Sequence, residues 1–222
     1  MGALVSREWP ERSAPPALVD DLRFRRLVGA DGWDRLPRAV QRRFAKRLGP
    51  GGAVTYHGHI DSCTMNPAGW LIAQACRAIG APLPLDRTPG MAAVVTVTED
   101  GEGGGQVWSR LYARPRGFPQ VIHSAKRFAG PTGLEEYLGG GFGIALTLHA
   151  LDNGLRFTSD HYFVSFAGRR LRLPAWLGPG RLDIDHEDRG AGRFSFTLTL
   201  RHRLFGLLMR QHSLFADQGE AR

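Results

Sequence analysis

Cysteine is scarce in this sequence of 222 residues, which contains only Cys63 and Cys76. The two cysteines form no C-x-x-C pair, so the sequence predicts neither a disulfide framework nor a cysteine zinc site. Long apolar runs are also missing, because no stretch reaches the roughly 18 apolar residues that a membrane-spanning helix needs. The first residues also lack the apolar core of a signal peptide. We therefore expect no transmembrane segment and a cytoplasmic location.

The motifs of nucleotide binding and nucleophilic catalysis are missing as well. The glycine-rich stretches DGEGGGQ (100–106) and LGGGFG (138–143) lack the G-K-[ST] of a phosphate loop and indicate hairpin loops. No G-x-G-x-x-G follows a predicted strand, so no dinucleotide-binding domain is expected. No G-x-S-x-G turn presents a serine nucleophile. We therefore expect the chain to carry no cofactor of its own.

One set of residues has the chemistry of metal ligands. His57, His59 and Asp61 alternate along one predicted strand, and imidazoles two residues apart can bind a metal in some barrel enzymes. A cupin-type site would also need a glutamate three or four residues later, and the sequence continues with SCTMNP instead. Because Tyr56 and Ile60 occupy the other face, we expect the two histidines and Asp61 on a solvated outer face, with no metal.

Composition and charge limit the class of protein. The chain is 42% hydrophobic and 23% charged, which is typical of a globular protein that forms a sizeable core. We expect a flexible N-terminus (1–15), one domain (16–217) and a flexible C-terminus (218–222). The formal net charge of +8 favours an anionic partner. Much of this excess lies in residues 23–47, whose arginines, with Arg42, Arg43 and Arg47 among them, favour a solvated helical face over a nucleic-acid site.

Hydrophobic periodicity predicts a short helical start followed by many strands. Helices are expected within 15–29 and 36–49, and a third within 66–80, where Asn66 is a suitable N-cap and Pro67 fits the first helical position. A strand is expected before this third helix, at 51–62. Nine strand-like runs follow it, separated by turn residues: 91–100, 106–114, 119–129, 142–151, 154–166, 169–174, 181–187, 193–203 and 207–215. The last segment, 204–216, is compatible with either a strand or a short helix.

This order of elements predicts an α+β protein that is mainly antiparallel β. About ten sequential strands of even spacing favour a closed or nearly closed meander barrel of calycin type, because closure removes exposed strand edges. N-terminal helices precede the barrel, and one helix is inserted after the first strand. We expect this inserted helix to cross one end or face of the sheet. A barrel of this size is wide enough to hold one small ligand.

The stretch QVWSRLYAR (106–114) places an arginine between two aromatic residues on one strand face. Trp108, Arg110 and Tyr112 share that face, because side chains alternate across a strand. An inward orientation is favoured, since Ser109 on the other face is small and polar and the aromatic rings can fill a barrel interior. A buried guanidinium then needs a partner, either Glu136 or a ligand carboxylate. The alternative is a solvated surface stripe.

Several motifs together resemble a known family. QVWSRLYAR, QVIHSAKRF, LEEYLGGGFGIALTL, NGLRFTSDHYFVSFAGRRLRLPAWLGP and RFSFTLTL…LFGLLMRQ occur in this order over roughly residues 22–216. In this arrangement the chain resembles a bacterial family known as domain of unknown function 4166. In that family the domain stands alone or is attached to NAD(P)-binding modules of the saccharopine dehydrogenase or short-chain dehydrogenase type. The resemblance implies a separate NAD(P)-dependent redox protein as a partner, and the positions that match the family's polar pattern are Trp108, Arg110, Ser124, Glu136 and Glu187.

Three hypotheses for the function follow. The leading hypothesis is a barrel that binds a small apolar or amphipathic, anionic molecule and is accessory to a redox enzyme. Its expected ligand-binding residues are Trp108, Arg110, Tyr112, Ser124, Glu136 and His161. The second hypothesis is a cofactor-free isomerase or cyclase that uses a cavity carboxylate or His161 for acid–base chemistry. The third is a nucleic-acid or membrane-surface binder that uses the basic N-terminal helices, although we expect no nucleic-acid partner.

Overall fold

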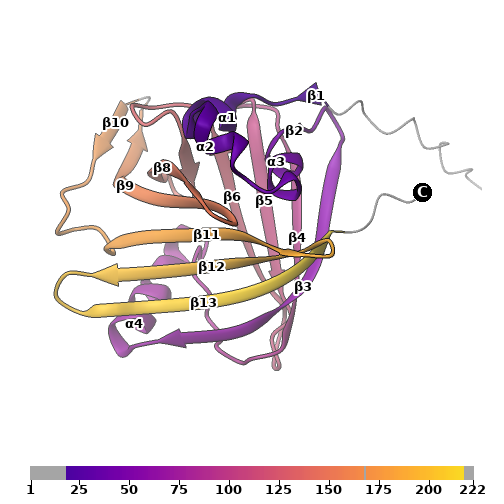
Figure 1. The fold of residues 1–222 in the computed structure, drawn as a ribbon. Coiled ribbons are helices and arrows are strands. Elements are labelled where there is room, and N and C mark those ends of the chain that lie inside the picture. Colours follow the sequence, from indigo (N-terminus) through magenta and orange to yellow (C-terminus); the bar gives the residue numbers. More distant parts are fainter. Residues whose placement is uncertain (1–18, 168, 218–222) are drawn as a thin grey trace, which may run out of the picture.

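The chain folds into a closed antiparallel β-barrel (Figure 1). The computed structural model describes residues 19–167 and 169–217, so the termini expected to be flexible, 1–15 and 218–222, lie outside the described residues. Ten strands follow one another around the barrel in the order β9-β11-β12-β13-β3-β4-β5-β6-β7-β8, and pairing of β8 with β9 closes the ring. The strand β10 extends the sheet beside β9. The predicted barrel is therefore confirmed, and it is closed.

The barrel strands agree with the runs predicted from the sequence, with one exception. Their bounds are β3 (Ala53–Met65), β4 (Met91–Asp100), β5 (Gly105–Tyr112), β6 (Gln120–Arg127), β7 (Glu135–Tyr137), β8 (Phe142–Leu151), β9 (Gly154–Phe166), β10 (Arg169–Arg172), β11 (Arg181–Gly190), β12 (Arg193–His202) and β13 (Gly206–Asp217). The three-residue strand β7 was not predicted, because it is too short to show an alternating pattern. The ambiguous segment 204–216 forms a turn followed by β13.

Three short helices close one end of the barrel. They are α1 (Arg23–Val28), α2 (Ala30–Asp34) and α3 (Arg38–Phe44), and Figure 1 shows them together above β11. Their apolar side chains pack with those of β8 and β9 in one core cluster. Phe44 at the end of α3 lies 5.8 Å from Phe157 of β9, measured between ring centroids. The helices therefore bury their apolar faces at this end of the barrel.

Both predicted N-terminal helices are shorter than expected. The prediction of a helix across 15–29 is wrong over residues 19–22, because β1 (Val19–Asp20) pairs with β2 (Lys46–Arg47), and residues 15–18 lie outside the described part of the chain. The same pairing ends the second helix at Phe44, where periodicity alone predicted that it would continue to residue 49. Backbone pairing with a distant segment thus overrides the local helical pattern at both positions.

Arg43 corrects the expectation that the early arginines only solvate a helix. Its side chain is 5% exposed, and its Nη2 atom lies 2.7 Å from Asp217 Oδ2 and 3.4 Å from Asp188 Oδ1. The guanidinium also lies 4.3 Å from the ring centre of Phe194. Arg42 is exposed, as expected. Arg43 therefore ties α3 to β11, β12 and β13, whereas its neighbour faces solvent.

The inserted helix crosses the other end of the barrel. This helix, α4 (Pro67–Ala75), continues into the 3-10 helix η1 (Cys76–Ile79), and Asn66 caps it by accepting a hydrogen bond of 2.7 Å from Gly69 N–H. At its start the backbone packs on Leu208 of β13 so closely that a Cβ atom at Gly69 would lie 2.2 Å from the Leu208 carbonyl oxygen. At its end, Ile79 packs against the turn between β7 and β8. The predicted position of this helix is confirmed.

No helix within residues 19–167 and 169–217 combines the length and the apolar character needed to cross a membrane.

Candidate ligand-binding cavity

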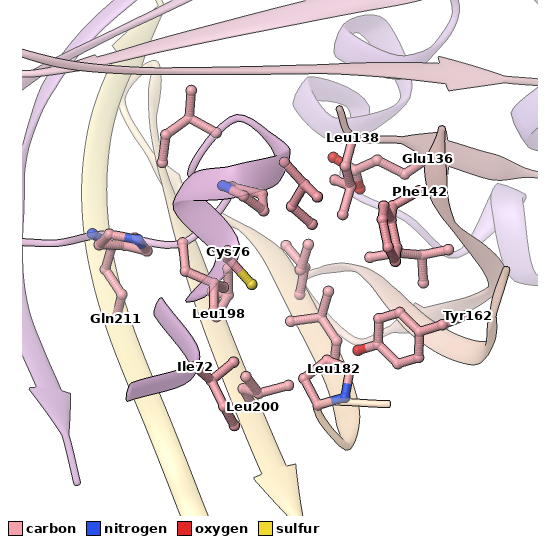
Figure 2. Close-up of a pocket in the computed structure, with 18 of the residues that line it drawn as sticks. Ile72, Cys76, Glu136, Leu138, Phe142, Tyr162, Leu182, Leu198, Leu200 and Gln211 are labelled. Atoms are coloured by element: carbon pink, nitrogen blue, oxygen red, sulfur yellow. The ribbon is translucent and has the colours of Figure 1, made fainter. Parts of the chain in front are cut away.

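An apolar cavity of about 630 Å³ lies inside the barrel between the two helical ends. Its walls are mainly aliphatic and aromatic side chains. Figure 2 shows Ile72 of α4 and Leu200 on one side of the space, with Phe142 and Tyr162 on the other. Phe44 and Phe157 contribute to the wall at the end that α1–α3 close. The volume falls within the range of roughly 300–1,000 Å³ that is typical of pockets for small organic ligands.

The strand β5 presents its aromatic and arginine face to this cavity. Trp108, Arg110 and Tyr112 all line it, as the inward alternative predicts. On the outer face of the same strand, Ser109 is half-buried and Leu111 is exposed. Strand alternation therefore brings one cationic side chain into an otherwise apolar interior.

Arg110 is held by two partners on neighbouring strands. Its Nη2 atom donates hydrogen bonds of 3.0 Å to Ser124 Oγ on β6 and 3.1 Å to Glu136 Oε1 on β7. Both of its described hydrogen bonds use this single nitrogen. The side chain is 20% exposed and lines the cavity, and its Nη1 and Nε atoms form no hydrogen bond within the described residues.

Lys126 is a second buried cation at the same carboxylate. Its Nζ atom lies 3.1 Å from Glu136 Oε2 and 4.9 Å from the ring centre of Trp108. The contact with Oε2 is an ion pair without the alignment of a hydrogen bond. Lys126 was not among the expected site residues. The sequence could have indicated Lys126 as a site residue, because it follows Ser124 by two positions and both side chains therefore lie on the same face of β6.

Burial and charge act against each other in this cluster. Burial raises the pKa of Glu136, but the nearby charges of Lys126 and Arg110 outweigh this effect and bring the pKa to about 2. Burial also lowers the pKa of Lys126, against the opposing effect of Glu136. Glu136 is therefore a carboxylate at neutral pH, and two basic side chains share its one negative charge.

A second polar region lies on β13. Gln211 and Ser213 are buried and line the cavity, and Gln211 Nε2 has no hydrogen-bond partner within the described residues. In Figure 2, Gln211 lies on the opposite side of the cavity from Glu136. The cavity wall thus offers an unused amide donor in addition to the charged cluster.

The structure does not bring every expected site residue to the cavity. Ser124 is buried and acts through Arg110. His161 faces away from the cavity, with its Nδ1 atom 2.6 Å from Asp160 Oδ2, whereas its neighbour Tyr162 lines the wall. The register between β8 and β9 shifts beside Asp160, which strand periodicity alone does not reveal. Glu187 on β11 pairs with Arg189 at 2.8 Å, and it does not line the cavity either.

Among the described residues, no cluster of histidine, cysteine and acidic side chains could hold a metal ion. His57, His59 and Asp61 are exposed on the outer face of β3, as expected. Cys63 and Cys76 are free thiols, and burial raises the pKa of both. The chemistry of the cavity therefore rests on Arg110, Lys126, Glu136 and the neutral polar groups around them.

Comparison with known proteins identifies the family. The model of the family described as "Domain of unknown function (DUF4166)" matches residues 36–215, which include almost every strand that surrounds the cavity. No curated protein and no solved structure matches the chain. Because the family match covers most of the sequence, the chain belongs to the DUF4166 family.

Proposed function

We propose that the barrel binds one amphipathic molecule with an apolar body and an anionic head, such as a carboxylate. The observation that carries this proposal is the excess of positive charge at Glu136, where Arg110 and Lys126 share a single carboxylate inside an apolar wall. An isolated buried charge costs several kcal/mol even after relaxation, so an incoming anion at this cluster is favourable.

Arg110 is the best placed anchor for the head group. A carboxylate can accept a charged hydrogen bond from Nη1 or from Nε while Nη2 stays bonded to Ser124 and Glu136. Trp108 and Tyr112 flank Arg110 on the same strand face and provide apolar contact area. The apolar body would then occupy the remaining cavity, where its burial contributes roughly 25 cal/mol per Å².

The enzymatic alternative gains no support from this geometry. A general acid needs a pKa near the working pH, and the pKa of Glu136 lies far below it. His161, the other candidate for acid–base chemistry, lies outside the cavity wall. An accessory role beside a separate NAD(P)-dependent protein remains part of the proposal on the family resemblance alone.

Binding of a fluorescent fatty acid and of its uncharged methyl ester tests the proposal. Arg110→Leu should weaken binding of the acid by about 2–5 kcal/mol and leave binding of the ester nearly unchanged. Arg110→Lys should restore only part of the affinity, because one ammonium group cannot reproduce the planar set of donors that serves Ser124, Glu136 and the ligand together. Lys126→Met should also reduce the preference for the acid, since it leaves Arg110 and Glu136 as a neutral pair.

The control is Arg114→Leu, which removes a cation from the surface immediately after β5 and should not change binding. Circular dichroism and thermal unfolding show whether each variant is folded. Equal affinity of the wild-type protein for acid and ester would overturn the proposal.

A further inference from the structure

The cavity opens to solvent at the end that α4 crosses. Some residues that line it are themselves exposed: Ala75 and Ala78 of the α4–η1 segment, Leu177 of the loop between β10 and β11, and Phe205 of the turn between β12 and β13. Asn66 Nδ2 also donates a 3.0 Å hydrogen bond to the Phe205 carbonyl oxygen, which ties the start of α4 to this turn. These three segments therefore border one opening.

The opening is surrounded by exposed apolar side chains, here called the apolar rim. Its members come from the three bordering segments: Trp70, Leu71, Trp176, Leu177, Leu204 and Phe205. The side chains of Trp176 and Leu204 are 77% and 83% exposed, so they project from the surface rather than pack on it. Figure 1 shows α4, the β10–β11 loop and the β12–β13 turn at the same end of the barrel, on the left. Exposed apolar groups gathered around one opening are typical of an interaction site.

The three segments that border the opening carry only positive formal charges. Residues 67–80, 169–181 and 200–210 contain no aspartate or glutamate. They contain eight arginines: Arg77, Arg169, Arg170, Arg172, Arg181, Arg201, Arg203 and Arg210. Only Arg170 and Arg181 form ion pairs within the part of the chain that the structure describes. Six arginines beside the rim are therefore available to an anionic surface.

We propose that this end of the barrel docks on a membrane surface that contains anionic lipids, and that the ligand passes between the bilayer and the cavity through the opening. The proposal rests on the proposed function for the identity of the ligand, but the docking step stands on the rim itself. Tryptophan and other apolar side chains insert at the headgroup level, and arginines beside them bind anionic headgroups.

Continuity between the rim and the cavity favours a bilayer over a protein partner. Leu177 and Phe205 belong both to the rim and to the cavity wall, so an apolar chain that leaves the bilayer meets apolar groups along its whole path. Passage through water would cost the free energy of exposing that chain, about 0.8 kcal/mol for each CH₂ group. A protein partner needs no such path into the interior.

The test is co-sedimentation of the full chain with vesicles of phosphatidylcholine alone and with about one-third phosphatidylglycerol. The wild-type protein should bind the anionic vesicles, and raised salt should weaken this binding. Two double variants should each weaken binding to the anionic vesicles about tenfold or more. One is Trp176→Ser with Leu204→Ser, and the other is Arg201→Gln with Arg203→Gln.

Matched controls remove the same groups elsewhere. Leu111→Ser/Val121→Ser replaces two exposed apolar side chains on the outer face of β5 and β6. Arg26→Gln/Arg193→Gln lowers the net charge by the same amount at exposed positions in α1 and at the start of β12. Both controls should sediment with anionic vesicles as the wild-type protein does.

Binding of the fluorescent fatty acid without vesicles separates this inference from the proposed function. The rim variants should keep that affinity and lose vesicle binding. Failure of the wild-type protein to bind any vesicle would overturn the docking inference and point to a protein partner at the rim, whatever the result with the fatty acid. An equal loss of vesicle binding in the rim variants and the control variants would also overturn the docking inference. Vesicle binding without discrimination between acid and ester would leave docking intact and remove the proposed ligand.

Discussion

At the scale of single residues, His186 is buried without a hydrogen-bond partner for its Nδ1 atom among the described residues. Its ring lies between Phe44, Phe194 and Phe196, at centroid distances of 5.0, 4.9 and 4.9 Å. Burial, with a smaller effect of Arg43, lowers its pKa to about 3. The folded protein therefore holds a neutral imidazole over a pH range in which the unfolded chain, with a pKa of about 6.5, binds a proton.

We expect His186→Phe to remove a pH-dependent part of the stability. Because the unfolded state binds the proton first, the wild-type free energy of unfolding should fall as the pH decreases from about 6.5 toward 3. The variant should lack this contribution and be at least as stable at pH 7, since an unsatisfied polar atom is replaced by an apolar group. A void of about 20 Å³ beside His186 gives the larger ring some room.

Urea unfolding of both proteins at several pH values gives the free energy of unfolding of each protein and its slope with pH. His57→Phe, at an exposed position on β3, serves as the control and should keep the wild-type slope. The same slope in wild type and His186→Phe would show that His186 is protonated in the folded protein.

At the scale of elements, α3 carries two adjacent arginines with different roles. Arg43→Gln should lower the free energy of unfolding by about 1–3 kcal/mol, because it removes the charged hydrogen bonds to Asp188 and Asp217. Arg42→Gln removes the same charge from an exposed position and should change stability by less than about 0.5 kcal/mol. Chemical denaturation measures both. Equal effects of the two substitutions would contradict a structural role for the Arg43 ion pairs.

These two arginines illustrate what sequence patterns can and cannot predict. Alternation placed Trp108, Arg110 and Tyr112 on one face, and the cost of a buried charge pointed to Glu136 as a partner, which the structure shows at 3.1 Å from Arg110. Helical periodicity predicted a helix within 36–49, but it says nothing about Asp217, which is 174 residues away from Arg43 in the chain.

Local irregularities account for the other failures of prediction. The shift of register beside Asp160 changes which side chains of β9 face inward, so Tyr162 and not His161 reaches the cavity. The pairing of β1 with β2 and the short strand β7 depend on contacts between separate segments. Such pairings leave no repeating pattern in the sequence that a period-based reading could detect.

At the scale of the whole molecule, the barrel places a charged cluster in the wall of an apolar cavity. Closure between β8 and β9 and the helices packed at both ends hold the strands that carry this cluster in place. A ligand that binds only the folded state stabilises it by mass action, by about 2.7 kcal/mol at a hundredfold excess over Kd. Thermal unfolding of the whole protein therefore reports whether a ligand binds at Glu136.

Glu136→Gln should make the protein less stable without ligand and more responsive to it. The substitution leaves Arg110 and Lys126 facing each other without their carboxylate, which should cost about 3–5 kcal/mol. A fatty acid that supplies a carboxylate at this cluster should then raise the melting temperature of Glu136→Gln more than that of the wild type. The same acid should raise the melting temperature of Lys126→Met least. The methyl ester should raise the melting temperatures of the wild type and both variants by the same amount. Differential scanning calorimetry with acid and ester measures these shifts, and an equal shift with both compounds in Glu136→Gln would show that the cluster does not recognise the anionic head.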